Sequence, residues 1–307
     1  MNKFLQVFNR LIALWVIIFG IIAFFFPKAF IIFKNSINIF FSFAMLGIGL
    51  VLKEEDYLNI LKTPGHVLFG TVCQFVIMPS MALITSYVFN LPLEWKIGLI
   101  ITGAAPGAMT SNVISYLSKA DTAYSISLTT LSTILCPLLT PLITYWIVHT
   151  HIPVNFWSMF KTILFVVVIP LIVGFIIRKI FSEYIDKIGE MPSAISVISI
   201  VFITSYVIAA NKERLGYATL IVILAVAFHN GMGMFLGYIA GYIIKLSHIK
   251  RKTLSIEVGM QNAGLGVILA LKHFGKDVAI PAAIFTVWCI LTASFLVYFW
   301  KIVEKSS

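Results

Sequence analysis

The chain has 307 residues, of which 60% are hydrophobic and only 11% are charged. Soluble domains carry about 45–50% apolar and about 25% charged residues, so this composition excludes an ordinary soluble protein. The formal net charge is +10, but the basic residues stand singly or in small groups between apolar runs. They therefore indicate membrane topology and not a nucleic-acid-binding patch, and the expected surroundings are a lipid bilayer with no nucleic acid partner.

Charged residues and clusters of Pro, Gly and Asn divide the chain into ten apolar segments. A tilted membrane strand needs about 10 residues and a spanning helix about 20, so the length of most segments favours helices. The predicted fold class is an all-α polytopic membrane protein with ten transmembrane helices. The predicted spans are residues 11–26, 36–52, 66–89, 96–117, 122–148, 158–177, 192–210, 217–244, 254–272 and 278–300.

The Lys and Arg residues are divided unevenly between the two sides of this ten-span arrangement. The side of the N-terminus holds 14 of the 22 and the other side holds 8. Because cytoplasmic connections are enriched in Lys and Arg, both termini are predicted to be cytoplasmic.

The two halves of the chain show a weak internal repeat at an offset of 156 residues. This offset aligns Gly103 with Gly259 and Gln74 with Asn230. Each half would hold five spans, and because five is odd the two copies must have opposite orientations in the membrane. Inverted repeats are typical of secondary transporters, in which the binding site lies between the repeats near the middle of the bilayer.

One acidic residue, Glu257, lies inside a predicted span, where it begins a stretch that holds two amides and three glycines. An ionisable group in the bilayer is costly and usually marks the path of an ion or a substrate. The alternative is that Glu257, near the start of its span, extends into cytoplasmic water. That alternative leaves Gln261 and Asn262, which lie deeper, without an explanation.

The fourth predicted span has a matching interruption from Gly103 to Asn112, where Pro and Gly break the helical hydrogen-bond ladder. The second half of a broken helix offers its positive end to an anion. The free carbonyls of the break, with the side chains of Ser111 and Asn112, offer oxygen atoms to a cation. A simple proline kink is the alternative explanation.

The fifth predicted span carries six hydroxyl residues within nine positions, from Ser125 to Thr133. Ser125 and Thr129 are four residues apart and share a helix face. Neutral oxygens beside a single carboxylate suit a hard monovalent cation, so we predict sodium. Helix packing is the preferred explanation for Ser127, Ser132 and Thr133.

Three stretches resemble the bile acid:sodium symporter family, and the similarity covers nearly the whole chain. They are residues 107–116 (GAMTSNVISY), residues 132–141, which end in Cys-Pro-Leu-Leu-Thr-Pro, and residues 257–265 (EVGMQNAGL). The resemblance implies two inverted five-helix repeats arranged as a panel domain and a core domain, with spans four and nine broken and crossing. The implied division is panel residues 1–65 and 151–212 and core residues 66–150 and 213–307.

The resemblance also implies two sodium ions and assigns their ligands. The first site would comprise Ser111, Asn112, Ser125, Thr129 and Glu257. The second site would comprise the side chains of Gln74, Glu257 and Gln261 and the backbone carbonyls of Val258 and Met260. The assignment of Gln74 comes from the resemblance alone.

The expected substrate is an organic anion, either bile-acid-like or a smaller carboxylate. Bile-acid-binding bacterial relatives continue from Val287-Trp288 with His-Asn, whereas this chain has Cys289-Ile290. The loss of that polar pair favours a smaller carboxylate, such as a pantoate-like hydroxy acid or a keto acid. Its carboxylate would bind where the broken helices direct their positive ends. The candidate residues are Met109, Thr110, Asn262 and Ala263.

The sequence therefore predicts a sodium-coupled symporter that imports an organic anion by alternating access, as a monomer in a bacterial inner membrane. The alternatives are a sodium-independent or proton-linked organic anion carrier of the same fold and, from another class, a polytopic membrane enzyme. An enzyme would need two acids, a Ser/His pair or a metal cluster at depth, and only Glu257 qualifies. We expect no enzymatic activity.

Overall fold

The computed structural model describes residues 2–53, 55, 62–150 and 152–306. Within these residues the regular structure is helical, apart from one isolated antiparallel bridge between Gly107 and Gln261. The predicted all-α fold is therefore confirmed. Most of the predicted connection between spans two and three, and residue 151 at a predicted domain boundary, lie outside the described residues.

The helices of the first half begin and end as follows. They are α1 (Asn2–Arg10), α2 (Ile12–Phe25), α3 (Lys28–Ile31), a 3-10 helix (Ile32–Ser36), α4 (Ile37–Val51), α6 (Pro64–Val88), α7 (Leu93–Gly103), α8 (Thr110–Leu117) and α9 (Thr122–Val148). Those of the second half are α10 (Phe156–Ile163), a π-helix (Leu164–Val168), α11 (Ile169–Ile180), α12 (Ser182–Ile188), α13 (Met191–Ala210), α14 (Lys212–Ile243), α15 (His248–Gly259), α16 (Ala263–His273), a 3-10 helix (Asp277–Ala279) and α17 (Ile280–Ser306).

Seven helical stretches of the described chain are long and apolar enough to cross a membrane, which makes the protein a multi-pass membrane protein. They are Lys28–Val51, Pro64–Val88, Thr122–Val148, Phe156–Ile180, Met191–Ala210, Leu220–Ile243 and Asp277–Trp300. Each corresponds to one of the ten predicted spans. The other three predicted spans are shorter or interrupted: the first forms α2, the fourth is divided into α7 and α8, and the ninth into α15 and α16.

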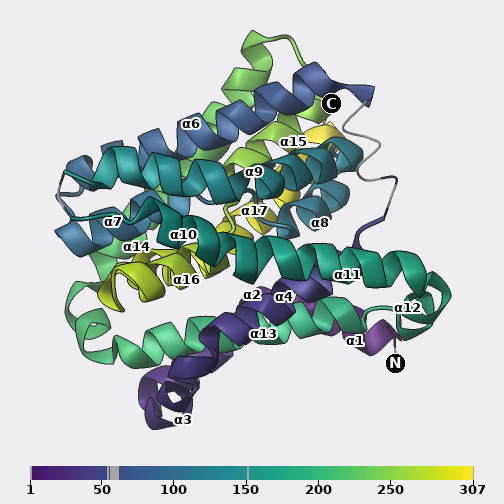
Figure 1. Cartoon of the computed structure of the whole chain (residues 1–307). Coiled ribbons are helices and arrows are strands. Elements are labelled where there is room, and N and C mark those ends of the chain that lie inside the picture. Colours follow the sequence, from purple (N-terminus) through teal and green to yellow (C-terminus); the bar gives the residue numbers. More distant parts are fainter. Residues whose placement is uncertain (1, 54, 56–61, 151, 307) are drawn as a thin grey trace.

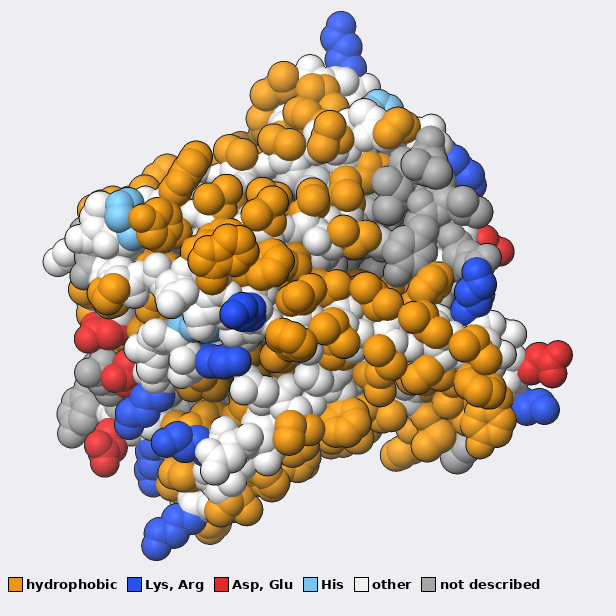
Figure 2. Space-filling model, viewed as in Figure 1, with side chains coloured by type: hydrophobic (Ala, Val, Ile, Leu, Met, Phe, Trp, Pro, Cys, Tyr) orange, Lys and Arg blue, Asp and Glu red, His pale blue; other side chains and the backbone are white. Residues whose placement is uncertain are grey.

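The surface also suits a lipid environment. Figure 2 shows hydrophobic side chains over most of the middle of the visible face, with charged side chains mainly toward two ends. Helix α11 is an example, because Ile172, Val173 and Ile176 are all exposed. Apolar surface of this extent is expected where the neighbours are lipid chains and not water.

The helices pack in two groups (Figure 1). In one group α4 packs against α11 and α13, and α13 also packs against α2. In the other group α14 packs against α6, α15 and α17, and α9 packs against α6. The two groups meet where α13 contacts α16 and α17, where α4 contacts α16 and where α2 contacts α17. They also meet at α10, which leads through the π-helix into α11 of the first group and contacts α9 of the second.

The close packing of α14 on α15 depends on glycine. A Cβ atom at Gly237 would lie 2.8 Å from the carbonyl oxygen of Leu254 and 2.9 Å from Cβ of Val258. Gly233, one turn earlier, similarly approaches Gly259. Small residues at this spacing let two membrane helices bring their backbones together. They place α14 directly against the segment of α15 that carries Glu257.

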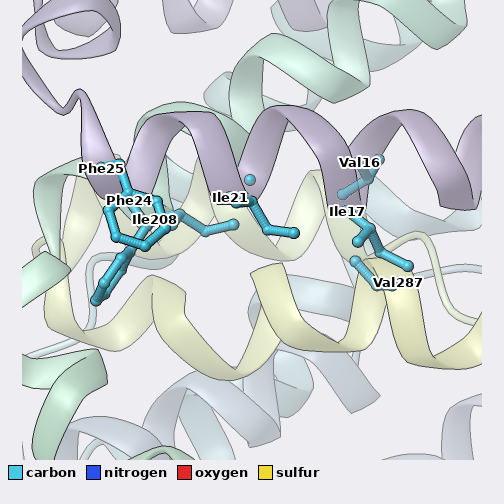
Figure 3. Close-up of a pocket in the computed structure, with 8 residues that line it drawn as sticks. Val16, Ile17, Ile21, Phe24, Phe25, Ile208 and Val287 are labelled. Atoms are coloured by element: carbon cyan, nitrogen blue, oxygen red, sulfur yellow. The ribbon is translucent and has the colours of Figure 1, made fainter.

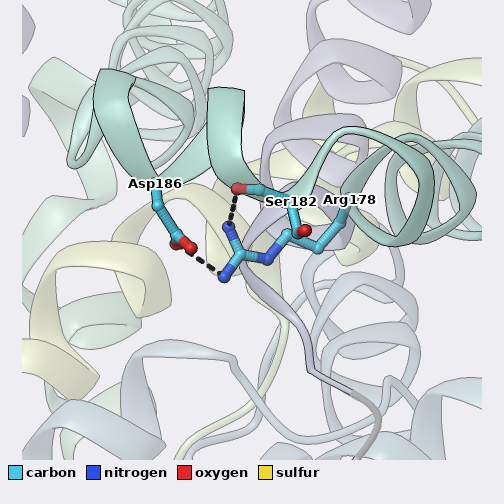
Figure 4. A network of polar contacts seen from close by, with 3 residues as sticks. All are labelled: Arg178, Ser182 and Asp186. Atoms are coloured by element: carbon cyan, nitrogen blue, oxygen red, sulfur yellow. Dashed lines mark hydrogen bonds and ion pairs between the residues drawn. The ribbon is translucent and has the colours of Figure 1, made fainter.

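A polar network holds the turn between α11 and α12 (Figure 4). Nη2 of Arg178 lies 2.7 Å from Oδ1 of Asp186, and Nη1 donates to the carbonyl of Ser182 at 3.5 Å. Asp186 is 67% exposed, and an ion pair so open to solvent stabilises a fold by about 1 kcal/mol at most.

Candidate functional site

Two helices are interrupted near the middle of the molecule. Residues 104–109 separate α7 from α8, and residues 260–262 separate α15 from α16. In the first interruption Pro106 has no amide hydrogen with which to continue the ladder. In the second, the Asn262 side chain accepts a hydrogen bond from the Leu265 amide at 3.2 Å and so caps the start of α16. Both interruptions fall where the sequence predicts them.

The two interruptions cross and are hydrogen-bonded to each other. The amide of Ala108 donates to the carbonyl of Met260 at 2.9 Å, and the amide of Asn262 donates to the carbonyl of Pro106 at 2.8 Å. These bonds accompany the isolated bridge between the same two segments. Backbone groups that the breaks release from the helices thus satisfy one another, as buried backbone requires.

Glu257 lies in the last turn of α15, next to this crossing, and is only 2% exposed. Its Oε1 accepts hydrogen bonds from the hydroxyls of Ser111 on α8 and Ser125 on α9. Its Oε2 accepts one from Thr129 on α9 at 3.0 Å. A buried carboxylate needs such partners because desolvation of an unpaired charge is expensive.

Asn112 completes the set of residues predicted for the first cation site. Its Oδ1 lies 2.9 Å from Oγ of Ser125 and 3.2 Å from Oγ1 of Thr129. All five residues of that prediction are therefore brought together, from α8, α9 and α15.

This cluster has more acceptor oxygens than protons to fill them. The hydroxyl of Ser125 is within reach of both Glu257 and Asn112, yet it carries one proton. Thr129 also carries one proton and faces three acceptors: the carboxylate of Glu257, the amide oxygen of Asn112 and, at 2.9 Å, the carbonyl of Ser125. An oxygen cluster with one formal negative charge and a deficit of donors has the chemistry of a site for a monovalent cation.

Most of the second predicted cation site also lies together. Nε2 of Gln74, from α6, donates to Oε1 of Gln261 at 2.8 Å, and Nε2 of Gln261 donates to the carbonyl of Val258 at 2.9 Å. Another group of this prediction, the carbonyl of Met260, accepts the amide of Ala108. A carbonyl oxygen has two lone pairs, so these bonds leave coordination capacity on both carbonyls.

The four residues predicted to hold an anion lie at the starts of α8 and α16. Met109 and Thr110 are partly exposed, and their amides have no hydrogen-bond partner among the described residues. Two open amides at the positive end of a helix suit a carboxylate. Asn262 is also partly exposed, whereas Ala263 is buried and its amide donates to the carbonyl of Gln261 at 2.7 Å.

The sequence assigns Ser132 to helix packing, and the structure adds a contact with the first interruption to its bond with the Thr129 carbonyl of its own helix. Its hydroxyl accepts the amide of Gly107 at 3.3 Å and so supports the first interruption. The signal available was its spacing, since Ser132 follows Thr129 by three residues and shares its helix face. Within the described part of the chain, the hydroxyls of Ser127 and Thr133 donate to carbonyls of their own helix, as in packing residues.

Asn230 on α14 supports the second interruption, a role that the sequence did not predict. Nδ2 of Asn230 donates to the carbonyl of Gly259, the last residue of α15, at 2.7 Å. The neighbouring His229 lies with Nε2 2.9 Å from the carbonyl of Met78, while its Nδ1 is buried with no hydrogen-bond partner among the described residues.

An apolar pocket lies apart from these polar residues, where α2 meets α13 and α17 (Figure 3). None of the predicted site residues lines it, and its walls offer no polar side chain to an ion. It is lined by Val16, Ile17, Gly20, Ile21, Phe24, Phe25, Ile208 and Val287.

Residues 38–217 of the chain match the Sodium Bile acid symporter family. The chain is 38% identical over 288 residues to a protein of Bacillus subtilis (strain 168) named uncharacterized sodium-dependent transporter YocS, and this match covers 94% of the chain and 90% of the relative. It is 31% identical to the probable sodium/metabolite cotransporter BASS1, chloroplastic, of Arabidopsis thaliana, over 84% of the chain and 64% of that protein. It is 30% identical to the probable sodium/metabolite cotransporter BASS2, chloroplastic, of Oryza sativa subsp. japonica, over 98% of the chain and 72% of that protein.

A solved structure is similar at the level of the fold. It is the sodium proton antiporter MjNhaP1 from Methanocaldococcus jannaschii, with a TM-score of 0.61 over 94% of this chain and 90% of that chain. The two sequences are 14% identical, so this likeness concerns the fold alone.

The sequence relatives are named as transporters or cotransporters, so the chain is a membrane transport protein and not an enzyme. By the extent of these matches it belongs to the Sodium Bile acid symporter family. The resemblance inferred from three short sequence stretches is thereby confirmed.

Proposed function

We propose that the chain is a symporter that uses a sodium gradient to import a small organic anion across a bacterial inner membrane. The observation that carries this proposal is the buried carboxylate of Glu257 at the crossing of two broken helices. The oxygens around it outnumber the hydroxyl protons available to them. A sodium ion supplies the positive charge that this cluster lacks, and the hydroxyls then turn their lone pairs toward the ion.

Two sodium ions bind in this proposal. The first is held by the oxygens of Ser111, Asn112, Ser125, Thr129 and Glu257. The second is held by the side chains of Gln74, Glu257 and Gln261 and the carbonyls of Val258 and Met260. The contact between Gln74 and Gln261 supports the second set, because two amide side chains from distant helices converge beside the second interruption.

The anion binds at the start of α8, where the amides of Met109 and Thr110 are open, with Asn262 and Ala263 at the start of α16 completing its site. The negative charge of Glu257 opposes an anion there until sodium neutralises it. Because the anion binds only after sodium has bound, the sodium flux and the anion flux are coupled. Cys289 and Ile290 are buried and present no polar pair, which favours a small carboxylate over a bile acid.

Transport proceeds by alternating access in a monomer of ten helices with both termini in the cytoplasm. Panel residues 1–65 and 151–212 move against core residues 66–150 and 213–307. The separate packing of α2, α4, α11 and α13 supports this division. The crossing supports an inverted repeat, because each interruption donates one amide to the other, as a two-fold relation between the two halves requires.

Uptake into proteoliposomes tests the proposal. A thermal-shift screen of small carboxylates with sodium or choline chloride selects the anion, and its uptake is then followed under an inward sodium gradient. We expect uptake in sodium only, and we expect Glu257→Gln to abolish it. Glu183→Gln, an exposed acid on α12, is the matched control and should transport normally.

Equal uptake in sodium and choline would contradict sodium coupling. Uptake in choline that follows an inward proton gradient would instead identify a proton-linked carrier of the same fold. A chemically altered anion inside the liposomes would contradict a transporter altogether.

A further inference from the structure

Lys252 is a buried charge that the proposed ion site does not use. It lies on α15 five residues before Glu257, about 7.5 Å along the helix axis at 1.5 Å per residue. By position it is one of the basic residues assigned to the cytoplasmic side, yet its side chain is only 1% exposed. Its Nζ lies 5.0 Å from the centre of the Trp300 ring, where a cation is attracted by the aromatic face.

Lys252 also contacts the end of α8. Its Nζ donates to the carbonyl of Ser118, the residue that follows the last turn of α8, at 2.6 Å. An ammonium group at this position satisfies a carbonyl that the helix leaves free, and it complements the negative end of the helix dipole. The same helix carries Ser111 and Asn112, two residues of the first proposed sodium site.

The next residue, Thr253, makes an equivalent contact with the start of α9. The amide of Asp121 donates to Oγ1 of Thr253 at 2.9 Å, and Oγ1 is 3.2 Å from the Asp121 carbonyl. Asp121 is the N-cap of α9, accepting the amide of Tyr124 at 2.9 Å. Helix α9 carries the other two hydroxyls of the site, those of Ser125 and Thr129.

We propose that Lys252 and Thr253 are positioning residues that hold the α8–α9 connection, residues 118–121, against α15. Glu257 belongs to α15, whereas the site's hydroxyls belong to α8 and α9, so this attachment sets the spacing between the carboxylate and the hydroxyls. Neither residue touches the proposed ion. The inference rests on the proposed function where it is tested by sodium-dependent uptake. Its second test, amide exchange of the purified protein, is independent of that function.

The first test is the sodium dependence of uptake. Lys252→Met removes the charge and the bond to Ser118, and we expect the half-saturating sodium concentration to rise about tenfold, with the maximal rate at saturating sodium kept within about twofold. Lys252→Arg keeps a buried cationic donor and should restore most of the sodium affinity. Lys187→Met, the same change on an exposed lysine of α12, is the control and should resemble the wild type.

Substitutions at Thr253 test the same proposal independently and remain informative if Lys252→Met does not fold. Thr253→Val removes the hydroxyl and should raise the half-saturating sodium concentration, whereas Thr253→Ser keeps the hydroxyl and should not. Variants with wild-type sodium dependence, or with a changed maximal rate but unchanged sodium affinity, would overturn the proposal.

The second test is hydrogen–deuterium exchange of the purified protein, which requires no transport. Lys252→Met and Thr253→Val should accelerate amide exchange in α8 and residues 118–121 more than in α6, and Lys252→Arg and Thr253→Ser should not. Wild-type exchange in both removal variants would overturn the positioning role. If wild-type uptake shows no sodium dependence, the proposed function fails while this measurement still decides the attachment.

Discussion

Gly107 and Gln261 pair as an antiparallel bridge at the point where two broken helices cross. The bridge brings the backbone of the first interruption against the carboxylate of Glu257, so that a Cβ atom at Gly107 would lie 2.9 Å from Oε2. Only glycine leaves room here for both the backbone pairing and the carboxylate. The crossing and the proposed ion site are therefore one packed unit.

The first prediction concerns this contact. Gly107→Ala should push the carboxylate of Glu257 away from Ser111, Ser125 and Thr129, because overpacking by one methyl group costs about 1–3 kcal/mol when neighbours cannot move freely. We expect a loss of sodium affinity of about tenfold in sodium-dependent uptake. Gly65→Ala is the control, since no atom lies within 4 Å of its added Cβ. Wild-type sodium dependence in Gly107→Ala would argue against the described contact.

A pair of serines on α9 separates the ion site from helix packing. Ser125 donates toward Glu257 and Asn112, whereas Ser127 donates to the carbonyl of Ala123 in its own helix. Ser125→Ala removes a hydrogen bond to a charged group, about 1.5–3 kcal/mol, and should raise the half-saturating sodium concentration about tenfold or more. Ser127→Ala should change it little. Equal effects of the two substitutions would contradict the assignment.

The glycine contact between α14 and α15 predicts a stability effect. Gly237→Ala introduces a Cβ atom 2.8 Å from the carbonyl of Leu254, a backbone group that cannot turn aside. The expected loss is about 1–3 kcal/mol, measured as a lower melting temperature in detergent. Gly231→Ala on the same helix meets no atom within 4 Å and should leave the melting temperature unchanged or higher.

The capping contact of Asn230 predicts a second stability effect. Its Nδ2 donates to the carbonyl of Gly259, and its Oδ1 accepts the hydroxyl of Thr292. Asn230→Leu leaves the carbonyl of Gly259 without this donor and the partly buried hydroxyl of Thr292 without this acceptor, and it should cost about 1–3 kcal/mol. Thr292→Val keeps the bond to Gly259 and should cost less. A double variant no worse than Asn230→Leu would show that the two side chains act as one network.

The ion pair at the turn after α11 predicts a small effect. Arg178→Met removes the contacts with Asp186 and with the carbonyl of Ser182, but Asp186 is largely solvated. The free energy of unfolding should fall by no more than about 1 kcal/mol. A larger loss would indicate that this turn contributes more to the fold than its exposure suggests.

Much of the candidate site could be predicted from sequence because lipid makes polar residues rare and therefore informative. Glu257 stands out because a charged side chain in an apolar span is energetically costly. Ser125 and Thr129 stand out because their spacing of four residues places both hydroxyls on one helix face. Gln74 does not, since a single amide has no local pattern, and it entered only through family resemblance. Lys252 was assigned by its position among other basic residues, and position along the chain carries no information about burial.

The sequence by itself determined that this protein spans a membrane, which segments are helical and where two of them break, and in which helices its scarce polar side chains lie, because hydropathy and helix periodicity are properties of neighbouring residues. Only the tertiary structure decided which oxygens gather around Glu257, that Ser132 and Asn230 support the interruptions, and that Lys252 is buried against Ser118. These contacts join helices that are distant in the chain. They depend on how the two interruptions cross, because each satisfies backbone groups that the other leaves free.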